Sequence, residues 1–334
     1  MDLSNKKILF IAPSFYGYEI EIRKELENAG AEVCYVQDNI EDTSFLYRTL
    51  GKFRCSLFNK LRDERIKRSI NKASKGSTFD YVFGIRLDTL NENLINDLRN
   101  KNPNALFLCY FWDSVNNMRS AEKVADKFDR VYTFDSSDAK VHPSWILRPL
   151  FFCNDFKASE SIIGTKQFDI LFIASLSKHR ATLYTELQSF CTRYNYVLKT
   201  IFVSKWYIFL IHWFKYPEYR KIPYSIISHK GLTRKEIADY YSKSKVVFDS
   251  SSPNQNGLTM RTLECFGAHK RMITTNNSIR EYDIYSPNNI YIYSCDKNEA
   301  MNLFMKCDKW EETSPTTYKY YSLGGWLNSI FNGK

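Results

Sequence analysis

The segment from Phe248 to Asn276 carries the residue types that hold a phosphorylated ligand. It reads FDSSSPNQNGLTMRTLECFGAHKRMITTN and places Ser, Pro, Asn and Gly between an apolar strand and an expected helix. Backbone N–H groups at Gly257, Leu258 and Thr259, together with the helix dipole, attract a diphosphate at such a junction. Arg261 adds a fixed charge with a forked set of donors. We therefore expect a phosphate site here.

Glu264 follows Arg261 on the same expected helix. Its carboxylate is placed to accept hydrogen bonds from ribose hydroxyls rather than to meet phosphate. The alternative is that Glu264 is a solvated helix residue and Gly257 a plain cap. We expect Arg261→Ala to weaken ligand binding and to leave folding intact, because an exposed phosphate ligand contributes little to the core.

Apolar strands alternate with helix-compatible segments along the whole chain, which indicates an α/β fold with two Rossmann-like domains. Domains are expected at 1–153 and 165–312, with a helical segment at 313–334 that can pack back on the first. Thr233 and Glu236 have the spacing of a capping box. The expected strands are Lys6–Ala12, Glu32–Gln37, Asp80–Gly84, Ala105–Trp112, Arg130–Phe134, Phe168–Ala174, Lys245–Asp249 and Arg271–Thr275.

The phosphate-site segment resembles the donor-site motif of bacterial GT-B glycosyltransferases of lipopolysaccharide and capsular polysaccharide biosynthesis. In that group a pattern like P-x-Q-x-G-L-T-M-R-T-x-E-x-x-G-x-x-K-x-x-I-T-T-N recurs. Phe168–Arg180 and Tyr110–Ser114 resemble the group more weakly, and Asn256 departs from the Glu, seven residues, Glu pattern of other GT-B enzymes. The matching residues are Pro253, Gln255, Gly257, Leu258, Thr259, Met260, Arg261, Thr262, Glu264, Gly267, Lys270, Ile273, Thr274, Thr275 and Asn276.

The resemblance implies two Rossmann-like domains that face a cleft, and sugar transfer from a nucleotide-sugar donor to a bacterial surface glycan. Ser175 and Arg180 follow a strand and are expected at the leaving diphosphate, with a plain surface loop as the alternative. Lys230 and Gly231 fall where such enzymes contact the nucleobase. The full expected donor set is Ser175, Arg180, Lys230, Gly231, Gln255, Asn256, Gly257, Leu258, Thr259, Met260, Arg261 and Glu264.

Asp113 follows eight largely apolar residues, so it is expected at the carboxyl end of a strand, where a general base can deprotonate an acceptor hydroxyl. The alternative is an Asp that caps the next helix. An inverting enzyme needs such a base, and a retaining one does not. Tyr16, Gly17 and Trp112 also follow strands and are expected on the acceptor side.

No metal or other cofactor is expected besides the nucleotide-sugar. The five histidines are dispersed, and Asp135–Asp138 looks like a helix-capping loop rather than a Mg²⁺ site. The helix dipole and an arginine can take the place of a cation.

The formal net charge of +10 favours a polyanionic partner, such as an anionic bilayer, nucleic acid or a phosphorylated substrate. No secretory signal opens the sequence, and the eight cysteines show no C-x-x-C spacing, so we expect a cytoplasmic protein, at most peripheral to the inner membrane face. Residues 52–75 are basic and amphipathic, and Trp206–Phe214 is apolar. Each is either a membrane-surface helix or an ordinary one, and we favour a solvated helix for the first and a buried helix for the second.

Two other functions compete with the glycosyltransferase. A GT-B sugar-nucleotide epimerase would share the phosphate site but needs a carboxylate and histidine set that the dispersed histidines do not supply. A noncatalytic binder of nucleic acid or anionic membrane would account for the charge and the 16% aromatic content. For the glycosyltransferase, no nucleic-acid partner is expected.

Overall fold

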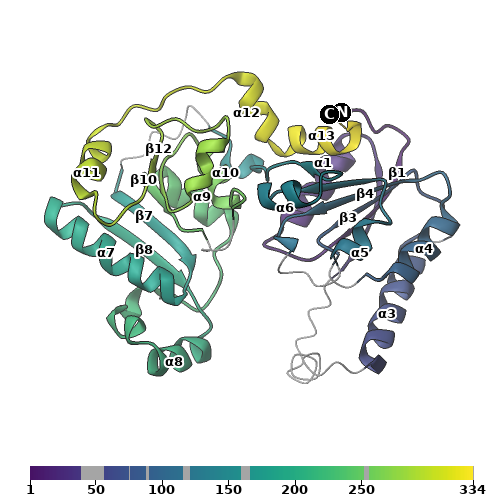
Figure 1. Cartoon of the computed structure of the whole chain (residues 1–334), viewed down its shortest axis with the longest axis horizontal. Coiled ribbons are helices and arrows are strands. Elements are labelled where there is room, and N and C mark those ends of the chain that lie inside the picture. Colours follow the sequence, from purple (N-terminus) through teal and green to yellow (C-terminus); the bar gives the residue numbers. More distant parts are fainter. Residues whose placement is uncertain are drawn as a thin grey trace. The chain divides into compact units, whose positions relative to one another are not determined.

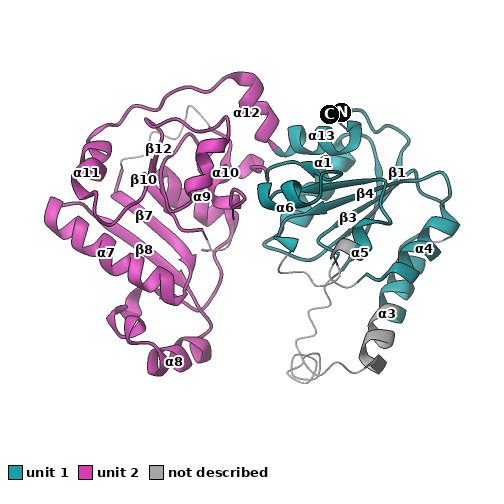
Figure 2. Cartoon of the chain, in the orientation of Figure 1, with its two compact units in different colours: residues 1–150, 323–334 teal, residues 151–322 magenta. Residues whose placement is uncertain are grey.

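The computed structural model describes residues 1–38, 56–74, 76–87, 90–115, 121–158, 166–251 and 256–333. The chain folds into two compact units: unit 1 is Met1–Leu150 with Leu323–Lys334, and unit 2 is Phe151–Ser322 (Figure 2). The first part of unit 1 thus ends at Leu150, whereas the sequence predicted that the first domain ends at residue 153. The C-terminal segment is shared, since its first helix belongs to unit 2 and its second to unit 1.

Unit 1 is built on a six-stranded parallel sheet with the order β2-β1-β3-β4-β5-β6. Its strands are β1 (Lys7–Ala12), β2 (Glu32–Gln37), β3 (Tyr81–Ile85), β4 (Leu106–Phe111), β5 (Arg130–Thr133) and β6 (Ile146–Leu147). Its helices are α1 (Tyr18–Asn28), α3 (Ser56–Ser74), α4 (Glu92–Lys101), α5 (Ala121–Ala125), α6 (Ser136–Val141) and α13 (Leu323–Asn332).

Both faces of the unit 1 sheet are covered, which explains why its central strands are almost wholly apolar (Figure 1). On one face Val82 and Cys109 pack with residues of α3, α4 and α5. On the other, Phe83 and Tyr110 contact the buried ring of Trp326 in α13, at centroid distances of 6.1 and 4.7 Å. The final helix is therefore part of the core of unit 1.

Unit 2 repeats the architecture with a six-stranded parallel sheet of order β12-β11-β10-β7-β8-β9. Its strands are β7 (Phe168–Ser175), β8 (Leu198–Val203), β9 (Ile227–Ser228), β10 (Ser244–Asp249), β11 (Arg271–Thr274) and β12 (Ile290–Ile292). Its helices are α7 (Lys178–Tyr194), α8 (Trp206–Lys215), α9 (Arg234–Ser242), α10 (Met260–Gly267), α11 (Asn298–Lys306) and α12 (Pro315–Tyr321), with 3-10 helices η2 (Asn154–Phe156), η3 (Pro217–Lys221), η4 (Tyr224–Ile226) and η5 (Asn277–Glu281). The α/β class and the two Rossmann-like domains are confirmed.

The strand order of each sheet contains one topological switch point. In unit 2 the chain runs outward from β7 in one direction and from β10 in the other, so the switch point lies between these neighbours. In unit 1 it lies between β1 and β3. Ligands of open α/β sheets bind at the carboxyl ends of the strands beside such a point.

The two segments weighed as membrane helices differ in the structure. The described part of α3 buries Ile66 and Ile70 in the core of unit 1, so its apolar side is already occupied. In α8 only Phe209 is buried, and the expectation of a buried hydrophobic helix is wrong. No helix among the described residues is long and apolar enough to cross a membrane.

Gly267 ends α10 at a point where another part of unit 2 comes very close. A Cβ atom at Gly267 would lie 2.4 Å from Cγ of Phe152, and the Gly267 carbonyl accepts hydrogen bonds from Ala158 N–H and from the Tyr318 hydroxyl, both at 2.7 Å. We expect Gly267→Ala to lower the free energy of unfolding by about 1–3 kcal/mol, because the ring must move. Urea unfolding measures this.

The matched control is Gly231→Ala, because a Cβ atom there meets nothing within 4 Å. It is expected to change stability by no more than about 0.5 kcal/mol. Equal free energies of unfolding for the two variants would show that the Phe152 ring moves aside without any loss of stability.

Candidate functional site

Arg180 joins the two strands at the switch point of unit 2. Its Nη1 donates to the carbonyl of Ser175, the last residue of β7, at 2.9 Å, while Nε and Nη2 donate to Oγ and the carbonyl of Ser250, directly after β10, at 2.9 and 3.0 Å. The backbone of Arg180 is fixed as well, because Ser177 caps α7 and accepts from the Arg180 N–H. Ser175 itself is exposed. The contact of both residues with a diphosphate stays a prediction.

Asp249 organises the start of α10. Its buried Oδ2 atom accepts hydrogen bonds from the hydroxyls of Thr259, at 3.1 Å, and Thr262, at 2.9 Å. Thr259 is the N-cap of the helix and accepts from the Thr262 N–H. The end of β10 and the start of α10 are thereby tied together. Sequence reasoning did not use Asp249, although its place at the end of an apolar strand with two threonines three apart was a signal.

The loop before α10 is also anchored from β11. The side-chain amide of Asn276 donates to the carbonyl of Gly257 at 3.2 Å, and Ser251 N–H donates to Oγ1 of Thr275 at 3.1 Å. Gly257 and Leu258 are buried, Thr259 and Met260 are half-buried, and Asn256 is exposed. Pro253 and Gln255 lie outside the described residues. The matched residues Thr275 and Asn276 thus position the loop.

Arg261 stands in the first turn of α10 and is less exposed than the sequence suggested. Its Nη1 atom is buried and has no hydrogen-bond partner among the described residues, although part of the side chain reaches solvent. Burial disfavours the charged guanidinium, but the neighbouring Tyr241, Glu264 and Asp249 outweigh this and raise its pKa above the ordinary value. Arg261 is therefore half-buried rather than exposed as expected, and we now expect its loss to affect folding as well as ligand binding.

Glu264 lies one turn beyond Arg261 and is also buried. Its Oε2 accepts a hydrogen bond from the hydroxyl of Tyr241, on α9, at 3.4 Å. The alternative of a solvated helix residue is excluded, and its contact with a ribose stays a prediction. Tyr241 was not singled out from the sequence, since a tyrosine in an amphipathic helix carries no distinctive signal.

The predicted nucleobase residues Lys230 and Gly231 lie in the exposed turn before α9. Ser228 Oγ donates to the Lys230 carbonyl at 2.6 Å, and His229 contacts the Ser204 carbonyl with Nδ1 at 2.8 Å. The capping box of Thr233 and Glu236 that follows is confirmed. This turn follows β9, at the same edge of the sheet as the loop before α10.

Unit 1 has a second group of polar and aromatic residues at its own switch point. After β1 the backbone takes left-handed conformations at Tyr16 (φ 52°) and Gly17 (φ 76°), and after β3 it does so at Arg86 (φ 69°) and Leu87 (φ 57°). Such conformations are costly for residues other than glycine and cluster at functional sites. They set the direction in which the chain leaves β1 and β3.

Asp113 lies beside Arg86, two residues past the end of β4. The Arg86 Nη2 and Asp113 Oδ2 atoms are 3.9 Å apart, and both side chains are one-third exposed. Ser114 N–H donates to Asp113 Oδ1 at 3.0 Å. The carboxylate is therefore accessible and oriented, as a general base requires. The capping alternative falls on 116–120, outside the described residues.

A different aspartate holds the segment after Asp113. Asp138 accepts hydrogen bonds from Val115 N–H, at 3.0 Å, and from the Ser114 hydroxyl, at 3.4 Å. Burial raises the pKa of Asp138, opposed by the Val115 N–H. Asp135 caps α6 through Ser137 N–H, so the reading of 135–138 as a helix-capping loop is confirmed. Among the described residues no group of three or more His, Cys, Asp or Glu side chains is placed to hold a metal ion.

The acceptor-side residues Tyr16 and Trp112 are brought together by Phe15. The Phe15 ring lies 4.7 Å from the Tyr16 ring and 5.5 Å from the Trp112 ring, and Phe15 and Tyr16 are exposed. Glu19 fixes this turn by accepting from Phe15 N–H and the Ser14 hydroxyl. Phe15 was not chosen from the sequence, although it stands within the loop that was.

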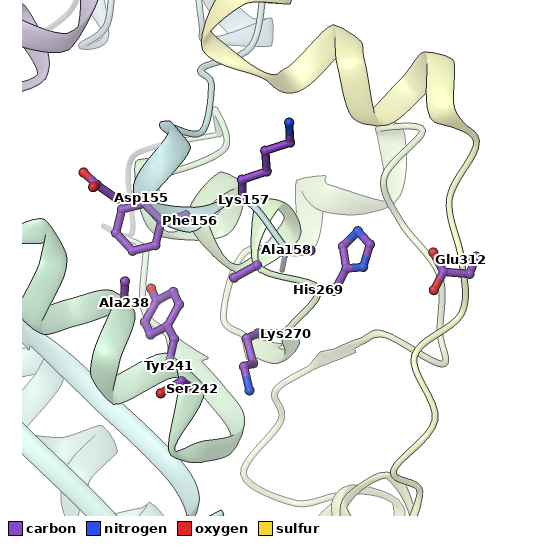
Figure 3. Close-up of a pocket in the computed structure, with 11 residues that line it drawn as sticks. Asp155, Phe156, Lys157, Ala158, Ala238, Tyr241, Ser242, His269, Lys270 and Glu312 are labelled. Carbon is purple, nitrogen blue, oxygen red and sulfur yellow. The ribbon is translucent and has the colours of Figure 1, made fainter. Parts of the chain in front are cut away.

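A cavity of about 530 Å³ lies at the opposite edge of the unit 2 sheet (Figure 3). It is lined by residues that include Phe156, Tyr241, His269 and Lys270, and Lys270 Nζ donates to the carbonyl of Ser244, the first residue of β10. Burial, aided by Lys166, lowers the pKa of Lys270 to about 8. Because this is the amino end of the strands, we do not assign the donor to this cavity.

No family model and no curated protein matches the sequence, but solved structures resemble the chain along almost its whole length. Sucrose-phosphate synthase from Thermosynechococcus elongatus has a TM-score of 0.61 at 12% identity and covers 98% of this chain and 99% of its own. A glycosyltransferase from Rickettsia africae has a TM-score of 0.59 at 15% identity, with coverage of 98% and 97%. The catalytic domain of starch synthase IV from Arabidopsis thaliana, bound to ADP and acarbose, has 0.58 at 10% identity, with coverage of 99% and 98%.

At these identities the likeness concerns architecture, and it agrees with the two parallel sheets and their strand orders. The chain has the two-domain α/β fold of the GT-B glycosyltransferases.

Proposed function

We propose that the protein is a glycosyltransferase that uses a nucleotide-sugar as donor. The observation that carries the proposal is the buried Nη1 of Arg261, which has no hydrogen-bond partner among the described residues and stands in the first turn of α10. A buried cationic donor beside a helix N-terminus at the carboxyl end of β10 suits an anion. The ADP bound to the similar starch synthase supports a nucleoside diphosphate as that anion.

In this proposal the residues of unit 2 contact different parts of the donor according to their charge. Gly257, Leu258 and Thr259 offer backbone N–H groups and Arg261 offers its guanidinium to the diphosphate. Ser175 and Arg180 meet the leaving phosphate, and Glu264 accepts from the ribose hydroxyls. The base lies along Lys230 and Gly231. These donors and the helix dipole supply the positive charge, so the proposal needs no metal or further cofactor.

The transfer step itself is a substitution at the anomeric carbon. An acceptor hydroxyl loses its proton, its oxygen bonds to the anomeric carbon, and the bond from that carbon to the diphosphate oxygen breaks with its electron pair. Asp113 takes the proton if the reaction inverts configuration. In a retaining reaction the leaving diphosphate assists instead, and Asp113 orients the acceptor.

We infer that the acceptor is a bacterial surface glycan, of lipopolysaccharide or capsule, carried on a lipid at the inner face of the cytoplasmic membrane. The exposed rings of Phe15 and Tyr16 next to Trp112 support a sugar acceptor, because sugar rings can stack on aromatic faces. The positive net charge of +10 supports work beside an anionic surface.

A thermal-unfolding screen tests the donor proposal directly. UDP-, GDP-, CDP-, dTDP- and CMP-sugars are added singly, and the matching one at 100 times its Kd should stabilise the protein by ~2.7 kcal/mol, a rise of roughly 5 °C in Tm. Selective stabilisation by one nucleotide identifies the base. Stabilisation by none of them overturns the donor proposal, and salt-dependent binding to nucleic acid would then favour a noncatalytic binder.

A further inference from the structure

Helix α8 presents an apolar surface to solvent on most of its circumference. Trp206, Ile211 and Phe214 are 63%, 60% and 67% exposed. Tyr207, Ile208, Leu210 and Trp213 are exposed as well. At 100° per residue these seven positions cover an arc of roughly 220°. Isolated exposed apolar residues are ordinary, but seven on one ten-residue helix form a patch that marks an interaction surface.

The remaining arc of α8 attaches the helix firmly to unit 2. Phe209 is buried and lies 6.2 Å, between ring centroids, from Tyr219 in η3, and His212 contacts the Tyr219 hydroxyl at 3.1 Å. Arg220 donates to the carbonyls of Trp213 and Phe214 and so satisfies the end of the helix. Figure 1 shows α8 at one end of unit 2, beyond β7 and β8. The apolar arc of α8 is therefore held in a fixed position on unit 2.

The charges that flank α8 in the sequence are mostly positive. Lys205 precedes the helix, Lys215 ends it, and Arg220 and Lys221 follow it, while residues 205–217 contain no Asp or Glu. The first carboxylate after the helix, Glu218, is engaged by Lys178 at 3.4 Å. A cationic rim around an apolar surface is complementary to a layer of anionic headgroups above acyl chains.

We propose that α8 docks the protein on an anionic lipid bilayer, with its axis in the plane of the headgroups. A helix of ten residues is about 15 Å long, half the thickness of the hydrocarbon core, so it lies in the interface. Two tryptophans and a tyrosine suit that depth, because their rings are apolar with a polar edge. The arc is wider than the stripe of a helix that pairs with one other helix, which favours lipid over a second copy.

The test uses the full chain and vesicles of phosphatidylcholine alone or mixed equally with phosphatidylglycerol. The unaltered protein should float with the mixed vesicles and much less with the neutral ones. The double variant Ile211→Ser, Phe214→Ser should bind the mixed vesicles at least tenfold more weakly, since two inserted apolar side chains are lost. The control, Val197→Ser with Leu303→Ser, removes side chains that are 54% and 72% exposed elsewhere on unit 2 and should bind normally.

Equal flotation of the two double variants, or no flotation of the unaltered protein, would overturn the proposal. So would a concentration-dependent dimer in sedimentation that the α8 variant alone abolishes, because the patch would then join two copies. The inference does not rest on the proposed donor chemistry. Stabilisation by a nucleotide-sugar should be the same in the α8 variant and in the unaltered protein, so either proposal can fail alone.

Discussion

Arg261→Ala is expected to weaken both the fold of unit 2 and its hold on a nucleoside diphosphate. The charge of Arg261 interacts favourably with the carboxylates of Glu264 and Asp249, which are buried. Removing it leaves two anions without that cation, which should lower the free energy of unfolding by roughly 2 kcal/mol, less than for a fully buried pair because part of Arg261 reaches solvent. Loss of one charge-assisted hydrogen bond to phosphate should weaken nucleotide binding roughly 10- to 100-fold.

The two effects are measured separately, by urea unfolding without nucleotide and by calorimetric titration well below the unfolding midpoint. Arg193→Ala, which removes an exposed arginine late in α7, is the control and should change neither quantity. A lower free energy of unfolding together with normal nucleotide affinity would show that Arg261 has only a structural role. A variant that is both stable and fully binding would contradict the assignment of the site.

Asp113→Asn is expected to lower kcat by roughly 10²- to 10⁴-fold if the proposed transfer inverts configuration, because the amide cannot accept the proton of the acceptor. The substitution keeps the shape of the side chain and an oxygen that can accept from Ser114 N–H. Donor affinity should stay unchanged, since the proposal assigns the donor contacts to residues of unit 2 and gives Asp113 only the proton of the acceptor. Release of nucleoside diphosphate from the donor found in the screen, with a panel of oligosaccharide acceptors, measures the rate.

Asp97→Asn controls for a change of surface charge, because Asp97 is an exposed residue of α4 paired with Lys67 at 2.9 Å. Its rate should equal that of the unaltered enzyme. A near-normal rate for Asp113→Asn together with retention of anomeric configuration would assign Asp113 to orienting the acceptor. A near-normal rate with inversion would require a different base.

Strand positions were predictable because a buried parallel strand is recognised by its apolar run. β2 has the predicted bounds, and β10 begins one residue earlier than expected. The strands β6, β8, β9 and β12 were not predicted, and β6 has only two residues. Lys199 and Thr200 interrupt the apolar run of β8, and β9 and β12 have only two and three residues. Such edge strands are set by pairing with a neighbour, which a single sequence does not reveal.

The side-chain environments were harder to predict than the backbone. The apolar sequence of Trp206–Phe214 led to the prediction of a buried helix. Whether other residues cover an apolar helix depends on tertiary packing, which the sequence does not show. Arg261 was expected to be an exposed phosphate ligand, because a helix of eight residues has too few turns to show which side faces the sheet. Asp113 was placed correctly at a strand end, since that placement depends only on where the apolar run stops.

The return of α13 to unit 1 affects the order in which the chain can fold as it is synthesised. Trp326 fills the space over Phe83 and Tyr110, but it is made after the whole of unit 2. The nascent unit 1 must therefore leave ring surfaces uncovered while more than 170 further residues, Phe151–Ser322, are translated. At about 5–20 residues per second this interval lasts roughly 10–35 s. During it, unit 2 can complete its own core first, and unit 1, although it begins the chain, is the later of the two to mature.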